Sequence, residues 1–325
     1  MTREDTPGIR VPRRPNIRTH QPALPRDFVP RDRLAGREIC VPGVTLVVGP
    51  AGFGKTVLLA DLAARSPCPV AWLSLGMGDP APERFVEHFV MAIREVAPGF
   101  GESTLAQIRS GFDPALVAER LANDLLAEPE PILLVLDDMH NATDPAIGDL
   151  LSNLIRWQPP TLHLVIASRV EPAMSLARAR AMGQVTDVSP DDLRFTRQET
   201  AAFLAVQPLP ANAEELADQV WDLTEGWPIA LRMHSVVLRD RPAGGGAGQA
   251  AMGRPLREFL LDEVLAHQPE ADREAMLRIA MPDVIDADLC SRLTGIDYPA
   301  AAALLERLAF TDRLLAPESD GAFTY

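Results

Sequence analysis

The chain has 325 residues, of which 47% are hydrophobic and 23% are charged, and its formal net charge is −14 at pH 7. This length and composition are typical of a globular protein with two or three domains and ample apolar material for their cores. The acidic balance argues against general binding to the phosphate backbone of nucleic acids, because such binding needs clustered positive charge.

No apolar stretch is long enough to cross a membrane, and the first residues lack the apolar segment of a secretory signal. The three cysteines, Cys40, Cys68 and Cys290, are far apart and show no metal-binding spacing, so they predict neither a zinc site nor a disulfide framework. We therefore expect a protein of a reducing compartment, the cytoplasm, with no membrane partner.

Residues 1–36 contain six prolines and little periodicity, which predicts an extended N-terminal arm rich in proline and arginine. The first 40 residues carry nine arginines against five acidic residues. Such an arm can touch nucleic acid or a membrane, although a solvated lead-in to the first domain explains the composition more simply.

Short, near-continuous apolar runs follow, and such runs are typical of strands buried on both faces of a parallel sheet. They lie at 44–49, 70–75, 131–138, 162–168 and, more weakly, 184–189. Helical spacing of apolar residues occupies 56–66, 83–96, 114–128 and 145–157. The alternation predicts a doubly wound, parallel-sheet α/β core over 37–190.

The strand signals stop near residue 190, and helical patterns replace them. Three helices are expected over 191–241, which predicts a small all-α unit. The glycine-rich stretch 242–253 is typical of a flexible spacer. A second helical domain is expected over 254–325, where the sequence stops within a predicted strand.

The sequence GPAGFGKT matches the phosphate-binding pattern G-x-x-x-x-G-K-[ST] and stands between a predicted strand and a predicted helix. Glycines permit close approach of backbone N–H groups to phosphates, and the N-terminus of the following helix attracts negative charge. The threonine offers a hydroxyl to Mg²⁺. The predicted nucleotide-binding residues of this P-loop are Gly49, Pro50, Ala51, Gly52, Phe53, Gly54, Lys55 and Thr56.

Lys55 is the only lysine among the 31 lysines and arginines of the chain. A phosphate-bridging position in a tight loop needs a compact charge on a slim stem, whereas the guanidinium is planar and bulkier. We therefore predict that Lys55 acts on the phosphates. The alternative is a chance glycine turn with an exposed lysine, which the strand–loop–helix context disfavours.

LLVLDD places Asp137 and Asp138 at the carboxyl end of a predicted strand, where open α/β sheets bind their ligands. We predict that Asp137 holds Mg²⁺ through water or Thr56, and that Asp138 orients or deprotonates the attacking water. The structural alternative is a strand followed by an acidic turn. Arg169 ends the next strand, where it either senses the γ-phosphate or lies on the surface.

The order of the motifs resembles one family over nearly the whole chain, from about Val29 to Tyr325. The series GPAGFGKT, AWLSL, LLVLDDMH, VIASR, LRFTRQE and TEGWPIAL is similar to the ATP-binding module of large LuxR-type transcriptional regulators of the maltose regulon activator type. These regulators are signal-transduction ATPases with numerous domains. A P-loop alone is shared with many NTPases, whereas this combination is more specific.

The resemblance implies that the helices over 191–241 form an all-α lid, in which Pro228 packs beside the adenine. It also implies that Arg169 senses the γ-phosphate and that Arg31 lies near the nucleotide. It also implies that the domain over 254–325 is a winged helix, incomplete at Tyr325, before any repeat sensor or helix-turn-helix. Members of the family rest with ADP bound, and inducer with ATP opens them into oligomers. Because the resemblance does not include the DNA-binding helix-turn-helix and the chain is acidic, DNA binding is not expected of this chain alone.

The sequence favours an ATP-binding switch module of a transcriptional regulator, which uses Mg²⁺ with ATP or ADP, hydrolyses weakly, and has self-association or a regulatory protein as its partner. One alternative is a stand-alone P-loop ATPase or kinase acting on a small substrate. Another is a binding module without hydrolysis. The guanine-reading motif N-K-x-D is excluded because the only lysine lies in the P-loop, which favours adenine.

Overall fold

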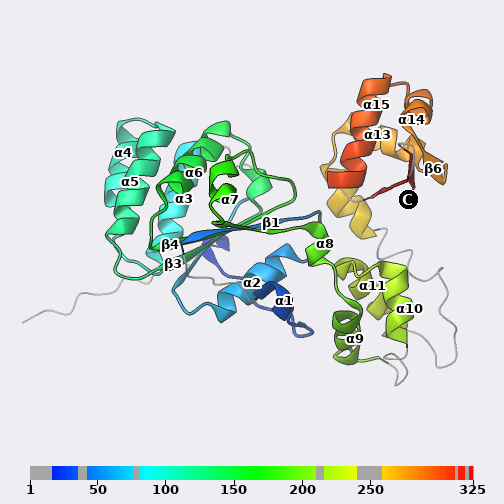
Figure 1. The fold of residues 1–325 in the computed structure, drawn as a ribbon, viewed down its shortest axis with the longest axis horizontal. Helices are drawn as coiled ribbons and strands as arrows, with labels where there is room; N and C mark the ends of the chain where they lie inside the picture. Colours follow the sequence, from blue (N-terminus) through cyan, green and yellow to red (C-terminus); the bar gives the residue numbers. More distant parts are fainter. Residues whose placement is uncertain are drawn as a thin grey trace, which may run out of the picture.

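The computed structural model describes residues 17–35, 42–76, 81–209, 216–239, 258–311, 314–318 and 322–324. Figure 1 shows an α/β layer, a group of lid helices beside one end of its sheet, and a C-terminal part of helices and short strands above the lid. The predicted glycine-rich spacer at 242–253 lies outside the described residues. The domain boundaries stay predictions.

The centre of the α/β layer is a five-stranded, all-parallel sheet with the strand order β2-β3-β4-β1-β5. The strands are β1 (Gly43–Val48), β2 (Val70–Ser74), β3 (Ile132–Asp137), β4 (Leu162–Ser168) and β5 (Val185–Val188). Every residue of β3 and β4 is buried, which is why both strands read as continuous apolar runs. The predicted doubly wound fold is confirmed.

Helices cover both faces of the sheet, as a parallel sheet requires. The four predicted core helices are present, and three shorter helices carry too little apolar periodicity to be read from the sequence. The predicted helices are α2 (Lys55–Arg65), α3 (Pro82–Arg94), α5 (Pro114–Leu126) and α6 (Pro145–Trp157). The additional helices are α4 (Glu102–Ser110), α7 (Ala177–Ala181) and α8 (Pro190–Leu193).

The segment before the sheet differs from the extended, solvated arm that its composition predicts. Over the described part it forms the short helices η1 (Ile17–Thr19) and α1 (Asp32–Ala35). Val29, Arg31 and Leu34 are buried. Isolated buried side chains, separated by prolines, anchor the segment. Because these residues show no helical or strand periodicity, the sequence does not reveal how the segment packs.

The lid consists of α9 (Arg197–Ala205), α10 (Ala217–Thr224) and α11 (Pro228–Arg239), as predicted. Its own apolar cluster includes Phe203, Val220 and Leu231, and Val29 from the N-terminal segment joins that cluster. Thr196 begins α9 with a reciprocal capping box to Glu199. The lid therefore packs as a unit that includes part of the N-terminal segment.

The C-terminal part combines helices with a small antiparallel sheet of order β6-β8-β7, which fits the winged helix that the resemblance implies. Its helices are η5 (Leu260–Val264), η6 (Leu265–His267), α13 (Glu270–Ile279), α14 (Ala287–Thr294), α15 (Tyr298–Glu306) and η7 (Arg307–Thr311). Its strands are β6 (Val284–Ile285), β7 (Ala316–Pro317) and β8 (Phe323–Thr324). A separate apolar cluster holds this part together.

The cysteine spacing predicts no disulfide framework, yet Cys68 is disulfide-bonded, whereas Cys290 is a buried free thiol. Sequence spacing gave no signal for this bond, since it does not reveal which cysteines the fold brings together. Within the described ranges, the structure contains no helix with the length and hydrophobicity needed to cross a membrane.

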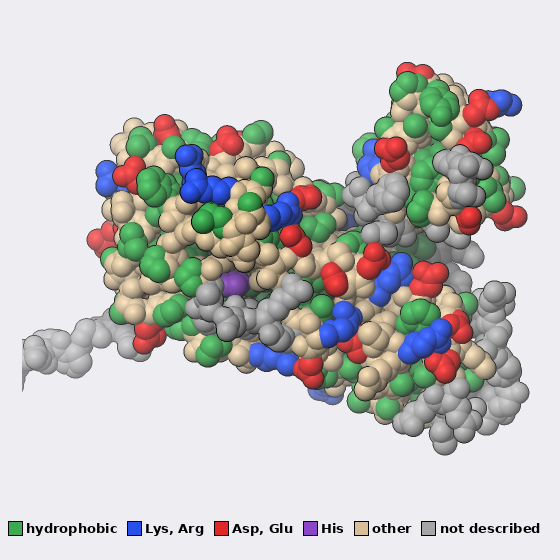
Figure 2. All heavy atoms as spheres, viewed as in Figure 1, with side chains coloured by type: hydrophobic (Ala, Val, Ile, Leu, Met, Phe, Trp, Pro, Cys, Tyr) green, Lys and Arg blue, Asp and Glu red, His purple; other side chains and the backbone are tan. Residues whose placement is uncertain are grey.

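The surface charge of the lid is mixed. On the face drawn in Figure 2, basic and acidic side chains alternate over the lid and its surroundings. Arg197 pairs with Asp218 and Asp222, and Arg194 pairs with Glu225. The positive charges of these two arginines are therefore paired with carboxylates of the lid itself.

Candidate functional site

The P-loop joins β1 to α2 at the carboxyl edge of the sheet, and two of its glycines adopt backbone angles that favour glycine. Gly52 has a φ of 78° and Gly54 a φ of 75°, both in the left-handed region. A Cβ on Gly52 would also lie 2.5 Å from the side chain of Ile229 in α11. The loop therefore needs glycine both for its turn and for its contact with the lid.

Lys55 opens α2 and is only 7% exposed. Its ammonium donates to the carbonyl oxygens of Gly49 at 2.6 Å and Pro50 at 2.9 Å, across its own loop. Burial, and next the charge of Arg169, lower the pKa of Lys55 to about 8, while the neighbouring aspartates oppose the shift. A positive charge is thus held inside the loop, beside the N-terminus of a helix.

Asp137 ends β3 and is 2% exposed. The hydroxyl of Thr56 donates to one of its carboxylate oxygens at 2.9 Å, and the backbone N–H of Asp138 donates to the other at 3.0 Å. Burial, and next the charge of Asp138, raise the pKa of Asp137 to about 6. The predicted pair of Thr56 and Asp137 therefore forms in space, although 81 positions separate them.

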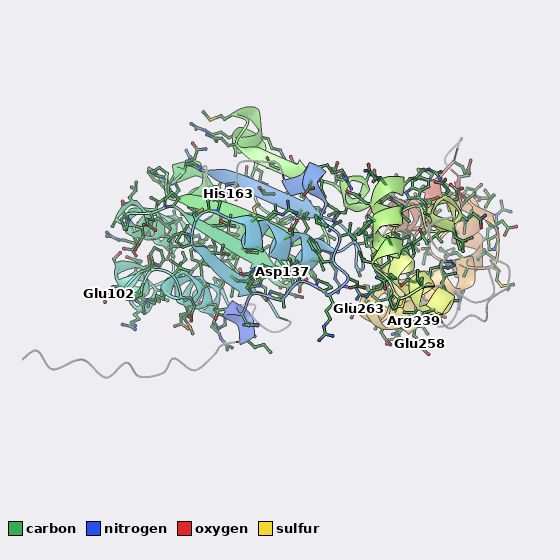
Figure 3. The ribbon with its side chains drawn as sticks, turned by 90° about the horizontal axis from the view of Figure 1, so that it is seen from below. Glu102, Asp137, His163, Arg239, Glu258 and Glu263 are labelled. Atoms are coloured by element: carbon green, nitrogen blue, oxygen red, sulfur yellow. The ribbon has the colours of Figure 1, made fainter. Side chains whose placement is uncertain are left out.

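The oxygen atoms of Thr56 and Asp137 suit Mg²⁺, a hard cation that takes one or two protein ligands and completes its shell with phosphate and water. Over the described residues, no group of three or more His, Cys, Asp or Glu could hold a metal on its own. Figure 3 shows Asp137 on the side of the sheet that faces Glu263.

Asp138 follows β3 in a left-handed conformation, with a φ of 57°. This conformation is uncommon for a residue with a side chain. The carboxylate lies 3.9 Å from the ring of His140 and lines a cavity of about 660 Å³ in front of the P-loop. His140 lines the same cavity.

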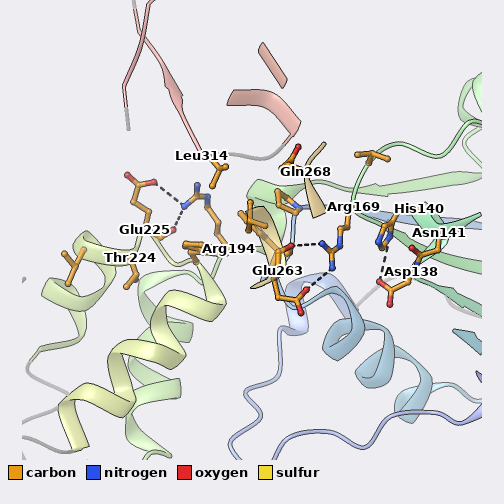
Figure 4. Close-up of a pocket in the computed structure, with 17 residues that line it drawn as sticks. Asp138, His140, Asn141, Arg169, Arg194, Thr224, Glu225, Glu263, Gln268 and Leu314 are labelled. Carbon is orange, nitrogen blue, oxygen red and sulfur yellow. Dashed lines mark hydrogen bonds and ion pairs between the residues drawn. The ribbon is translucent and has the colours of Figure 1, made fainter. Parts of the chain in front are cut away.

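Arg169 also lines this cavity, at the end of β4, but its guanidinium is already bound. It donates to the backbone oxygen of Glu263 at 3.0 Å and to the Glu263 carboxylate at 3.0 Å (Figure 4). Glu263 belongs to η5 of the C-terminal part. Nothing in the sequence pattern singled out Glu263, and only the fold brings it to the edge of the sheet.

A second, smaller cavity of about 190 Å³ is lined by two of the P-loop glycines, Gly52 and Gly54. Its walls come from the N-terminal segment, the lid and the loop, and they are mostly apolar. The apolar lining residues include Val29, Phe195, Phe203, Pro228, Ile229 and Leu231. The lid meets the loop directly here, since the N–H of Ile229 donates to the carbonyl of Gly52 at 3.2 Å.

Arg31 and Pro228, the two residues placed near the nucleotide by resemblance, both line the smaller cavity. Arg31 is 3% exposed and donates to the carbonyl oxygens of Leu193 at 2.8 Å and Gly54 at 3.1 Å. Burial lowers the pKa of Arg31 to about 10. Its guanidinium therefore fastens the N-terminal segment to the P-loop and α8, with its hydrogen bonds going to the backbone.

The structure thus brings all the sequence-predicted site residues to one loop. Lys55, Thr56 and Asp137 meet at its centre, and Asp138 and Arg169 face the larger cavity. The predictions missed acidic residues that line the two cavities, among them Glu263 in the larger cavity and Asp27 in the smaller one. Both come from segments distant in sequence from the motifs.

The sequence comparisons find relatives among transcriptional regulators. Residues 261–325 match the family model of the MalT winged helix domain. The chain is 33% identical over 264 residues to the HTH-type transcriptional regulator MalT of Cronobacter sakazakii, a match that covers 78% of this chain and 28% of that protein. It is 30% identical over 287 residues to MalT of Serratia proteamaculans, covering 85% of this chain and 31% of that protein.

The likenesses to solved structures are more distant. A signal-transduction ATPase with a tetratricopeptide repeat sensor from Pyrococcus horikoshii matches with a TM-score of 0.48 at 14% identity, covering 95% of this chain and 43% of that chain. The RuvB branch migration motor of Thermotoga maritima matches with a TM-score of 0.43 at 14% identity, covering 94% and 95%. The chain spans about three tenths of the length of these MalT regulators. The order of its motifs predicts this similarity to regulators of the MalT type.

Proposed function

We propose that this chain is a nucleotide-operated switch module that binds Mg-ATP and ADP, hydrolyses ATP weakly, and changes the position of its C-terminal part with the nucleotide state. The observation that carries the proposal is the bond between Arg169 and Glu263. It joins the predicted phosphate sensor to the C-terminal part across the larger cavity.

The site suits a nucleotide laid across the P-loop. The phosphates would lie against the loop N–H groups, and Lys55 would exchange its two backbone carbonyls for phosphate oxygens. Thr56 and Asp137 would hold Mg²⁺, which neutralises phosphate charge when bound. The base would enter the smaller cavity beside Pro228, and the γ-phosphate would point toward Asp138 and Arg169.

Arg169 is the residue that would link nucleotide state to conformation. Its guanidinium donates hydrogen bonds to both the backbone oxygen and the carboxylate of Glu263. A γ-phosphate that accepted hydrogen bonds from the same N–H groups would compete with Glu263. A diphosphate lacks the competing group and would leave the pair intact. A switch requires only that the ligand distinguish two states, which is why slow hydrolysis suffices.

A regulatory role is proposed from the relatives, whose printed names are those of HTH-type transcriptional regulators. The partner of the opened state would be a second copy of the chain or another regulatory protein. Direct DNA binding is not part of the proposal. The net charge of −14 and the ion-paired arginines of the lid both disfavour a surface that tracks a phosphate backbone.

A stand-alone ATPase or kinase acting on a small substrate is the second candidate. The size of the larger cavity, about 660 Å³, favours it, because that volume falls within the roughly 300–1,000 Å³ of small-molecule sites. Phosphoryl transfer would use the same P-loop and Asp138. The two candidates differ in rate and in product, since a kinase transfers phosphate to an acceptor other than water.

The deciding experiment measures equilibrium binding of Mg-ATP and Mg-ADP by calorimetry, together with steady-state phosphate release and, for each nucleotide, the radius of gyration. We expect binding of both nucleotides, release well below one phosphate per second, and a larger radius with ATP than with ADP. Kinase-like turnover, on the order of 1–100 per second, would favour the second candidate. Absence of nucleotide binding would overturn both.

A further inference from the structure

The smaller cavity contains a single carboxylate among its described lining residues, that of Asp27. Its volume of about 190 Å³ is below the roughly 300–1,000 Å³ of pockets that hold a whole ligand, so it suits one flat part of a nucleotide, the base. The surrounding walls are mostly aromatic and aliphatic. A polar group in such a place decides which base edge is accepted.

Asp27 is fixed in position by two side chains of the lid. Gln207 donates to one carboxylate oxygen at 2.9 Å, and Arg232 donates to the other at 2.9 Å. The side chain is 19% exposed. The carboxylate is thus oriented before any ligand arrives, which is the arrangement that recognition of a defined base edge requires.

The charge state of Asp27 follows from the same contacts. Burial raises its pKa, but the hydrogen bond from Gln207 and the charge of Arg232 outweigh burial, and the pKa is lowered from its ordinary value. An ionised carboxylate only accepts hydrogen bonds, and each of its oxygens can accept more than one. After the bonds from Gln207 and Arg232, both oxygens retain capacity for a donor on a ligand.

The other charged side chains on this wall have different tasks. Arg31 gives its hydrogen bonds to two backbone carbonyls, and Arg232 bonds Asp27 itself. We propose that Asp27 accepts a hydrogen bond from the 6-amino group of adenine and thereby selects adenine over 6-oxopurines, an inference that rests on the proposed nucleotide site. A 6-oxo oxygen in that place would face a carboxylate oxygen with no proton between them.

The test is a thermodynamic cycle in which the 6-amino group of the ligand and the carboxylate of Asp27 are removed separately and together. Competition against a ribose-labelled fluorescent ADP gives the affinities of ATP and of purine riboside triphosphate, which lacks only the 6-amino group. Because a hydrogen bond to a charged group contributes roughly tenfold to hundredfold in affinity, we expect that preference for ATP in the native chain. In Asp27→Ala the preference should fall to near one.

Asp27→Asn provides the second variant, since its amide can donate to a 6-oxo group, and we expect it to gain affinity for inosine triphosphate. The matched control is Asp222→Asn, which removes an arginine-paired carboxylate from the lid at a position outside the cavity. It should keep the native preference. Thermal unfolding of each variant reports whether the fold is retained.

The outcomes separate this inference from the proposed function. If the labelled ADP binds and Asp27→Ala weakens ATP and purine riboside triphosphate by the same factor, Asp27 only positions the N-terminal segment and the inference is wrong. If the native chain binds both triphosphates equally, adenine is not read at this position. If no nucleotide binds at all, the proposed function fails first.

Discussion

Arg169 and Glu263 lie 94 positions apart in the sequence, yet the guanidinium of one donates to both the backbone and the carboxylate of the other. The contact spans the boundary between the α/β layer and the C-terminal part (Figures 1 and 4). The pair is partly exposed, with side-chain exposures of 27% and 45%. The contribution of this ion pair to stability is therefore modest.

Replacing Glu263 with glutamine should favour the triphosphate. The loss of one partly exposed ion pair is worth at most about 1 kcal/mol, so the ratio of ADP to ATP dissociation constants should rise about fivefold or less. Calorimetric titration with both nucleotides gives the ratio. Asp262→Asn, at the neighbouring position outside the cavity, is the control. An unchanged ratio in Glu263→Gln would show that the ion pair between Arg169 and Glu263 does not contribute to discrimination between ADP and ATP.

Lys55→Ala should abolish measurable Mg-ATP binding, with a loss of roughly a hundredfold or more, because it removes a buried charge that faces the phosphates. Lys55→Arg should not restore binding, since the lysine is enclosed by the carbonyls of Gly49 and Pro50. Arg109→Ala removes an equal charge from the exposed face of α4 and should bind normally. Binding retained in Lys55→Ala would refute the site.

Asp138→Asn should slow phosphate release by at least roughly tenfold while leaving the ATP dissociation constant within about twofold, if its carboxylate acts on the attacking water. Single-turnover phosphate release and equilibrium binding separate the two effects. Asp137→Asn is the comparison, and it should lose Mg²⁺-dependent affinity as well. Parallel loss of binding and hydrolysis in Asp138→Asn would assign that residue to the metal instead.

Nucleotide affinity should depend on pH through Asp137, whose pKa is raised to about 6. Mg²⁺ requires the ionised carboxylate, so Mg²⁺-dependent affinity should be constant above pH 7 and fall toward about tenfold per pH unit below pH 6. Stability of the unliganded fold runs the other way. The folded carboxyl keeps its proton to a higher pH than the unfolded one, so that contribution is present below pH 3.8 and is lost as the pH rises through about 6.

Titration with a ribose-labelled fluorescent ATP between pH 5 and pH 8, with and without Mg²⁺, measures the first effect, and thermal unfolding between about pH 3 and pH 8 measures the second. Asp137→Asn should remove the Mg²⁺-dependent fall in affinity and the part of the stability profile that Asp137 contributes, because asparagine does not titrate. An affinity that stays constant down to pH 5 would contradict the assignment of Asp137 as the metal ligand.

The features that could be predicted from the sequence are the local ones. A β-branched run, a glycine loop and an apolar helix stand next to each other in the chain, so the P-loop and Lys55 were recognisable at once. Asp137 was recognisable because it ends a buried strand. Strands β3 and β4 were predicted because every residue in them is buried, whereas β5, with the sequence VTDV and only Val188 buried, gave the weaker signal.

The features that escaped prediction depend on contacts between distant segments. Asp27 lies in the proline-rich N-terminal segment and Glu263 in an apolar helical stretch, neither beside a recognised motif, and only the fold carries them to the walls of the two cavities. Helix α4 buries mainly Thr104 and so shows no apolar stripe. The N-terminal segment is held by isolated residues such as Val29 and Arg31, for which no periodic signal exists.

The hydrogen bond from the lid to the P-loop has a thermodynamic consequence. Ile229 bonds the carbonyl of Gly52, whose loop is the one that would wrap the phosphates, so lid and ligand act on the same few peptide units. If a nucleotide tightens the grip of the lid by some factor, clamping the lid by any other means must raise nucleotide affinity by that same factor. A molecule that binds only the outer face of the lid could therefore control occupancy of a site it never touches.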